Sequence, residues 1–196
     1  VSGFLALISM FLITYLYEVI PSITYIDQAV LNFSYHLHTL NSVKAAMYLA
    51  VFFDKYSLAS AYAIILLNLL YHKQYEKILI ISFCSLGCSI SVFTLKHVFM
   101  NPRPDLIIHH LHSFSYPSGH TASVTTLAMI LSHNQSKAFK SLLIFIVSLT
   151  MLSRVFIGAH WLFDVFGGLC LGLTFGYLFQ FLLRKYTIQW KINFKV

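Results

Sequence analysis

The stretch that decides the fold is Leu162–Leu183, LFDVFGGLCLGLTFGYLFQFLL, an apolar run that carries one charged residue, Asp164. A helix of these 22 residues is about 33 Å long, enough to cross the roughly 30 Å hydrocarbon core of a bilayer. Across the whole chain of 196 residues, 58% are hydrophobic and 10% are charged, and the mean hydropathy is +0.76. This balance excludes an ordinary soluble domain and indicates an integral membrane protein.

Five more apolar runs precede this stretch in the sequence. Two of them are short, and each would reach only about 20 Å as a helix, so flanking residues must extend them or the bilayer must thin. We therefore predict an all-α, polytopic membrane bundle of six transmembrane helices, forming a single domain over residues 1–196. The five runs are Gly3–Ile20, Ser57–Tyr71, Ile78–Leu95, Thr121–Ser132 and Ser141–Ile157.

An amphipathic helix is predicted between the first two spans. Its polar positions are Asp27, Asn32, His36 and His38, and its apolar positions recur at helical spacing. Such a helix can lie in the outer membrane interface, or it can pack on the bundle as an ordinary connection. We assign it no chemistry. The apolar positions are Ile26, Ala29, Val30, Phe33, Leu37 and Leu40.

The net charge of +7 does not indicate a nucleic-acid partner, because the cations are sparse and divided among short loops. With six spans, one side of the membrane holds 8 of the 13 cations and the other side holds five. The positive-inside rule makes the richer side cytoplasmic. The richer side carries Lys73, Lys77, Lys137, Lys140, Arg184, Lys185, Lys191 and Lys195; the other carries Lys44, Lys55, Lys96, Arg103 and Arg154.

Small and sulfur-containing residues inside the spans are interpreted as packing residues. Cys84 and Cys88 share one helix face at a spacing too wide for an easy disulfide, and Cys170 lies in another span. A stripe of glycines at every fourth position of the last span allows another helix to approach closely, which we attribute to packing within the bundle. The stripe consists of Gly168, Gly172 and Gly176.

The first of three polar motifs is KHVFMNPRP, Lys96–Pro104. The residue before Pro102 disfavours helical angles, so the third span ends there and Arg103 is held extended between two prolines. Lys96 as a point charge and Arg103 as a bidentate fork can then converge on one anion. Two cations that snorkel at the membrane interface are the alternative.

The second motif is YPSGH, Tyr116–His120, at the start of the fourth span. Ser118 and Gly119 at a helix start would present main-chain N–H groups and the positive end of the helix dipole to an anion. His120 would face the same pocket. For so short a match taken alone, a capped helix with an interfacial histidine is the favoured interpretation.

The third motif is SRVFIGAHWLFD, Ser153–Asp164, between the last two spans. On one unbroken helix Arg154 and His160 would lie about 240° apart, so a break at Gly158 is needed to bring them together. Asp164 follows His160 by one turn and can accept a hydrogen bond from one imidazole nitrogen, which leaves the other free to attack. This pattern is typical of a nucleophile oriented by an acid, although a structural hydrogen bond is possible.

All three motifs fall on the same predicted side of the membrane. Together they resemble the three-part signature of the type 2 phosphatidic acid phosphatase family, which is related to bacterial acid phosphatases and vanadium haloperoxidases. Every signature position is matched between Lys96 and Asp164. The six-span topology extends the resemblance over nearly the whole chain.

The resemblance implies a role for each motif residue. His160 would attack phosphorus and form a phosphohistidine, Asp164 would orient it, and His120 would protonate the leaving oxygen and then activate water. No step requires a metal or another cofactor. The phosphate-binding residues would be Lys96, Arg103, Ser118, Gly119 and Arg154.

The loop before the second motif carries three histidines. His109, His110 and His112 have only Asp105 nearby as a carboxylate, which is weak evidence for a metal site. We interpret the loop instead as the mouth of the site. Leu106, Ile107 and Ile108 would dip into the interface where a lipid enters.

We therefore expect a metal-independent lipid phosphatase in a bacterial inner membrane, with its site facing the periplasm or the exterior. The lipid bilayer and a lipid phosphate would be its partners: undecaprenyl diphosphate, phosphatidylglycerol phosphate, phosphatidic acid or lipid A 1-phosphate. A lipid phosphotransferase stays open, because nothing in the sequence separates water from a second lipid as acceptor. A binding or transport protein would not need the pair of His160 and Asp164, and a site buried in the membrane disfavours a vanadate-dependent oxidase.

Overall fold

A computed structural model describes residues 3–6, 8, 9, 11, 21–52, 54–104 and 113–193. Within these ranges the regular structure is helical, and no strand occurs. The all-α prediction is therefore confirmed for the described part of the chain. Its helices are α2 (Pro21–His36), α3 (Leu40–Phe52), α4 (Lys55–Tyr71), α5 (Tyr75–Phe99), α6 (Gly119–Leu131), α7 (Lys137–Phe156) and α8 (Leu162–Asn193).

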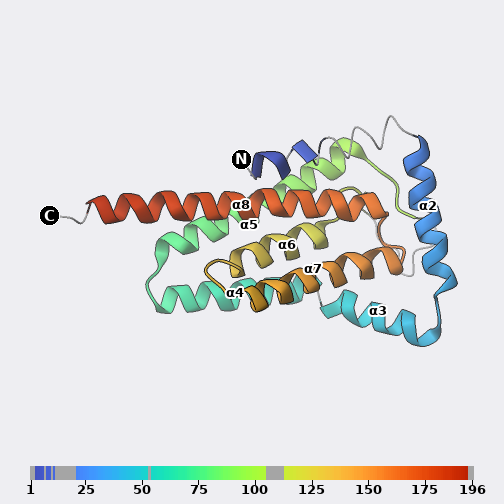
Figure 1. Ribbon diagram of the computed structural model, residues 1–196, viewed down its shortest axis with the longest axis horizontal. Helices are drawn as coiled ribbons and strands as arrows, with labels where there is room; N and C mark the ends of the chain where they lie inside the picture. The colour runs from blue at the N-terminus through green and yellow to red at the C-terminus, as the bar shows by residue number, and fades with distance from the viewer. Residues whose placement is uncertain are drawn as a thin grey trace.

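The helices form a bundle around α6. Helices α4 to α8 run roughly along the long axis of the molecule, and α2 crosses one end of the bundle (Figure 1). Helix α6 is the most enclosed, since eight of its 13 residues are buried. It contacts α4, α5, α7 and α8 and is only about 20 Å long.

Among the described residues, four stretches are long and apolar enough to cross a membrane: α3 taken with α4 (Leu40–Tyr71), Tyr75–Phe99, Lys137–Phe156 and Leu162–Tyr186. Helix α5 shows the pattern that a lipid-facing helix needs. Its inward face buries Ile80, Cys84 and Cys88, while its outward face is also apolar. Exposed apolar residues at helical spacing are expected where the solvent is lipid. On α5 they are Leu79, Phe83, Leu86, Ile90 and Phe93.

The glycine stripe of α8 packs against α6, as predicted. A Cβ atom added at Gly168 would lie 2.4 Å from the main-chain oxygen of Ser118, and one at Gly172 would lie 2.6 Å from that of Ala122. At Gly176 it would lie 2.3 Å from Cβ of Met129. Any side chain at these positions would push α8 away from α6. The three cysteines are free thiols, which agrees with a packing role.

The segment between the first two expected spans contains more helix than the sequence indicated. Helix α2 covers most of the expected amphipathic helix, but α3 was not predicted, because its apolar residues form no long run. Asp27 in α2 and His38 just after it each form a hydrogen bond with the bundle. Asp27 accepts a hydrogen bond from the main-chain N–H of Phe163 (3.2 Å), and Nε2 of His38 donates one to the main-chain oxygen of Phe156 (2.8 Å). These contacts hold the two ends of the loop that carries His160.

Candidate active site

The three motifs meet at the end of the bundle that α2 crosses. The start of α4, the end of α5, the start of α6, the end of α7 and the connection from α7 to α8 surround one cavity of about 460 Å³. The periodicity of the sequence placed the motifs on one side of the membrane, and the fold brings them into one cavity. Six of the eight residues predicted for the site line it: Lys96, Arg103, Gly119, His120, Arg154 and His160.

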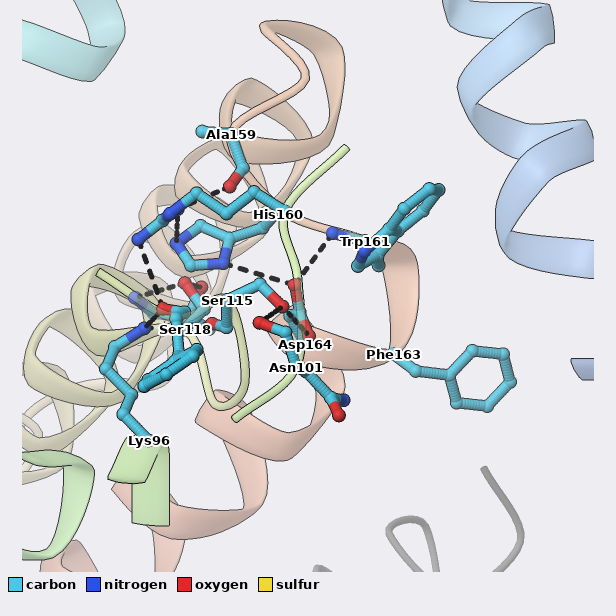
Figure 2. Close-up of polar contacts among 12 residues, drawn as sticks. Lys96, Asn101, Ser115, Ser118, Ala159, His160, Trp161, Phe163 and Asp164 are labelled. Atoms are coloured by element: carbon cyan, nitrogen blue, oxygen red, sulfur yellow. Dashed lines mark hydrogen bonds and ion pairs between the residues drawn. The ribbon is translucent and has the colours of Figure 1, made fainter. Parts of the chain in front are cut away.

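His160 is oriented by Asp164. Nδ1 of His160 lies 3.3 Å from Oδ2 of Asp164, and both side chains are buried. Figure 2 shows the imidazole between Asp164 on one side and the main-chain oxygen of Ala159 on the other. Because a carboxylate can only accept, Nδ1 carries the proton and Nε2 of the neutral ring keeps its lone pair. Nε2 is therefore the atom that can attack an electrophile in the cavity.

Asp164 is itself fixed by donors on both of its oxygens. Oδ2 accepts a hydrogen bond from the main-chain N–H of Trp161 (2.9 Å), and Oδ1 lies 3.4 Å from the hydroxyl of Ser115. Figure 2 shows these contacts at the first turn of α8. The carboxylate position is thus set by the start of its own helix and by the loop before α6.

Lys96 and Arg103 are bound to main-chain oxygens that aim them at the cavity. The ammonium group of Lys96 donates to the oxygens of Phe114 and Ser115. Arg103 donates from Nε to the oxygen of Ser113 (2.7 Å) and from Nη1 to that of Ala159 (2.5 Å). Loop carbonyls thus hold both cations in place before any anion binds.

The cations and burial also set the protonation of the nucleophile. Nη1 of Arg103 lies 3.4 Å from Nε2 of His160. Burial, and then the charges of Arg103 and Lys96, hold the pKa of His160 well below its usual 6.5. Burial also lowers the pKa of Arg103, and Asp164 opposes this effect. His160 is therefore the neutral base, with its lone pair available, at neutral pH.

An interruption of the helix between Arg154 and His160 brings the two residues together, as predicted from Gly158. Helix α7 ends at Phe156, and Gly158 adopts a φ of 68°, which is favourable for glycine. The main-chain N–H of His160 then bonds back to the oxygen of Arg154 (3.2 Å). Arg154 is buried, and its Nη2 donates to the oxygen of Ala50 (2.6 Å). Its Nε is buried and has no hydrogen-bond partner within the described residues.

The start of α6 contributes a backbone and a histidine to the cavity. Ser118 is fully buried, and its hydroxyl caps α6 by accepting from the N–H of Thr121 (3.5 Å). Its side chain does not line the cavity, whereas Gly119 and His120 do. A Cβ atom at Gly119 would lie 3.2 Å from Cγ1 of Val92, so glycine keeps this wall of the cavity open.

Asp54 is a site residue that the sequence analysis missed. It precedes α4, and its Oδ1 lies 3.3 Å from Nε2 of His120. A lone acid outside every motif carries no local signal. Two clues were available in the sequence. The chain has only six acidic residues, and Asp54 lies on the same predicted side of the membrane as the three motifs. Asp54 is positioned to orient His120 as Asp164 orients His160.

The histidine loop lies outside the described residues, as do Asp105 and the expected mouth residues Leu106, Ile107 and Ile108. His109, His110 and His112 are therefore not placed. Among the residues that are described, no group of three histidine, cysteine or acidic side chains is close enough to hold a metal ion.

Comparisons with known proteins identify the family of the chain. Residues 75–187 match the model of the PAP2 superfamily. The undecaprenyl-diphosphatase BcrC of Bacillus subtilis is 29% identical over 164 residues, which are 79% of this chain and 80% of that protein. An undecaprenyl-diphosphatase of Sulfolobus acidocaldarius is 30% identical over 152 residues, which are 74% of each protein.

A solved structure shares the fold. The crystal structure of a transmembrane PAP2-type phosphatidylglycerolphosphate phosphatase from Bacillus subtilis superposes with a TM-score of 0.86 over 94% of this chain and 96% of that one, at 19% identity. The chain is thus an integral membrane protein, and the family resemblance inferred from its three motifs is confirmed. This chain belongs to the PAP2 superfamily.

Proposed function

We propose that this chain removes the terminal phosphate from a lipid phosphate at the outer face of the membrane, through a phosphohistidine on His160. That it is a phosphatase follows from its family. The substrate, the intermediate and the residue roles are the proposal. The observation that carries it is the arrangement of His160: Nδ1 is bound to Asp164, and Nε2 faces a cavity that three cations line.

The first chemical step forms a bond from Nε2 of His160 to phosphorus and breaks the bond to the lipid oxygen. Lys96, Arg103 and Arg154 stabilise the charge on the phosphoryl oxygens. His120 gives its proton to the leaving oxygen, and the nearby carboxylate of Asp54 stabilises the protonated ring. The main-chain N–H of Gly119 at the start of α6 adds a donor, which Ser118 holds in place by capping the helix.

The second step releases phosphate and restores the enzyme. His120 takes a proton from a water molecule, the water oxygen attacks phosphorus, and the bond to His160 breaks. The neutral ring is recovered with its proton still on Nδ1, against Asp164. No group outside the chain and the substrate is consumed.

The cavity lining supports a lipid substrate. Beyond the charged residues, the cavity continues between α4 and α5, where Leu58, Ala59, Tyr62 and Val92 line it. A hydrocarbon chain would bury itself against these side chains while its phosphate met the cations. We propose undecaprenyl diphosphate as the substrate, because two relatives that share most of the chain's length are undecaprenyl-diphosphatases.

The proposed membrane position has six spans. The four long apolar stretches supply four of them. Helix α6 is a fifth, short and enclosed, and the apolar run that begins at Gly3 is the sixth. A Cβ atom added at Gly3 would lie 3.2 Å from Cβ of Tyr177 on α8. In this position α2 lies in the outer interface. The larger group of cations lies at the other end of the bundle, and by the positive-inside rule this supports a site at the outer face.

The test is phosphate release in detergent with EDTA present. Undecaprenyl diphosphate, phosphatidylglycerol phosphate, phosphatidic acid and lipid A would be compared for wild type, His160→Ala and the control His72→Ala, which alters an exposed histidine at the opposite end. We expect release from undecaprenyl diphosphate in wild type and control but not in His160→Ala. Phosphate release from another lipid alone would contradict the assignment of undecaprenyl diphosphate as the substrate. Full release by His160→Ala would contradict the proposed role of His160 as the nucleophile.

A further inference from the structure

A second cavity lies at the end of the bundle opposite the active site. It has a volume of about 450 Å³ and sits where α6 gives way to α7, against the later turns of α8. Its lining includes His133 and Asn134 from the connection, Lys140 from α7, and Gln180 and Arg184 from α8. No motif of the sequence and no step of the proposed reaction uses these residues.

Within the described part of the chain, no acidic side chain forms an ion pair with the cations of this cavity. The two ion pairs found among the described residues, Asp54 with His120 and Asp164 with His160, both lie at the active-site end. Glu76 is the only acidic residue described at the opposite end, and it lines a separate apolar pocket. Lys140 and Arg184 are thus free to bind an anion.

His133 lies in the positive electrostatic field of several basic side chains around the cavity. Burial lowers its pKa, and the charges of Arg184, Lys77 and Lys140 lower it further. Three basic side chains therefore act on one imidazole from three different helices, α8, α5 and α7. Cations that only set the topology of a membrane protein do not need to converge in this way.

An apolar groove of about 310 Å³ lies beside the basic cavity. Ser132 and Lys140 line both spaces, so the two adjoin each other. From there the groove follows successive turns of α7, where Leu143 and Val147 line it, with Leu173 of α8 on the other side. A basic head region at the membrane surface that opens into an apolar channel has the shape and polarity of a phospholipid.

We propose that this end of the protein holds one anionic phospholipid of the surrounding bilayer, with its phosphate between Lys140 and Arg184 and an acyl chain in the groove along α7. The amide groups of Asn134 and Gln180 can donate to the ester and phosphate oxygens. A soluble phosphate would use the basic cavity but would leave the groove without a function. The proposal is independent of the reaction at the other end of the molecule.

The experiment counts lipids that stay bound. Wild-type protein would be released from nanodiscs of phosphatidylglycerol and phosphatidylcholine in equal amounts and analysed by native mass spectrometry. The test variant is Lys140→Ala/Arg184→Ala. The matched control is Lys137→Ala/Lys185→Ala, which removes the same charges from exposed positions on α7 and α8 that do not line the cavity. Any lipid in the active site is common to all three proteins.

We expect wild type and control to retain one phosphatidylglycerol in preference to phosphatidylcholine by about tenfold or more, since each basic residue near a bilayer surface favours anionic lipid. In the test variant this preference should fall to about twofold or less. Equal retention of both lipids by wild type, or equal loss in test variant and control, would overturn the proposal.

A competition separates the lipid from its headgroup. Glycerophosphoglycerol, which has the headgroup but no acyl chains, should fail to displace the bound phosphatidylglycerol at a hundredfold excess. Displacement would show that the site recognises the anion alone, which would overturn the role of the groove. Melting temperatures of the three proteins, measured in the same detergent, verify that the test variant is folded.

Discussion

The two ends of the bundle use the same kinds of residue in opposite ways. At the active-site end, Lys96, Arg103 and Arg154 each donate to main-chain oxygens. At the opposite end, Lys140 and Arg184 are exposed and have no ion pair among the residues that the structure describes. A cation that catalyses must be held in place before its substrate arrives, whereas a cation that binds a bilayer lipid can adapt.

The acids follow the same division. Asp54 and Asp164 lie at the active-site end, each beside a histidine. Glu76, at the opposite end, is exposed and lines an apolar pocket. Parallel substitutions at the two ends therefore test whether the active-site end owes its properties to charge alone or to charge in a fixed geometry.

The largest difference is expected for the acids. Asp164→Asn should lower kcat/KM by about 10³ to 10⁴, because an amide no longer fixes the imidazole tautomer that attacks. Glu76→Gln, the same chemical change at the opposite end, should leave kcat/KM within about twofold. Phosphate release from a short-chain lipid phosphate in detergent measures both. Comparable losses of kcat/KM in the two variants would show that the acids at the two ends do not differ in their role.

The arginines give the next largest difference. Arg103→Ala should lower kcat/KM by about 10² to 10³, the usual loss for one donor that stabilises transition-state charge. Arg184→Ala should have no comparable effect on a short-chain substrate, whose turnover does not require a bound bilayer lipid. Steady-state assays of both variants with a melting curve for each supply the test, and a loss above tenfold in Arg184→Ala would contradict it.

Asp54→Asn sharpens the role of the acid that lies beside His120. We expect a loss of about 10- to 100-fold with phosphatidic acid, whose alkoxide leaving group needs a proton, because the protonated state of His120 loses its carboxylate partner. With p-nitrophenyl phosphate the loss should be smaller, since that leaving group departs without a proton. An equal loss on both substrates would indicate that Asp54 only supports the fold.

The smallest effect concerns Asp27, which holds α2 to the start of α8. Burial raises its pKa to about 6, and the main-chain N–H groups of Phe163 and Leu162 oppose this. A raised pKa means that the charged form destabilises the fold as pH rises through 6. Asp27→Asn keeps an acceptor and should raise the melting temperature by about 2–4 °C at pH 7.5 and not at pH 4. An equal shift of the melting temperature at both pH values would contradict the claim that the charged form of Asp27 destabilises the fold.

The pattern of the sequence predicted most of the bundle and the convergence of the motifs. Apolar length located α5 and α8, and the wide angle between Arg154 and His160 on one helix required the break that Gly158 provides. These features are local, because a run of residues or a single glycine decides each of them. The glycine stripe of α8 was readable for the same reason.

Features that depend on distant segments could not be predicted. Asp54 and Asp27 act on residues 66 and 136 positions away, and no local pattern announces such contacts. The contacts of Asp54 and Asp27 depend on tertiary packing, which decides where a polar side chain of known chemistry can reach. The hydroxyl of Ser118 caps α6, and its expected contact with phosphate stays a prediction.

The central claim, a covalent phosphate on His160, can be tested by trapping the intermediate. Undecaprenyl diphosphate labelled in its terminal phosphate would be mixed with the enzyme in EDTA and quenched in base within milliseconds. We predict base-stable label on the peptide that contains His160 in wild type and in His72→Ala, and none in His160→Ala. Phosphate release by wild type without labelled protein, or with label on another residue, would contradict the account.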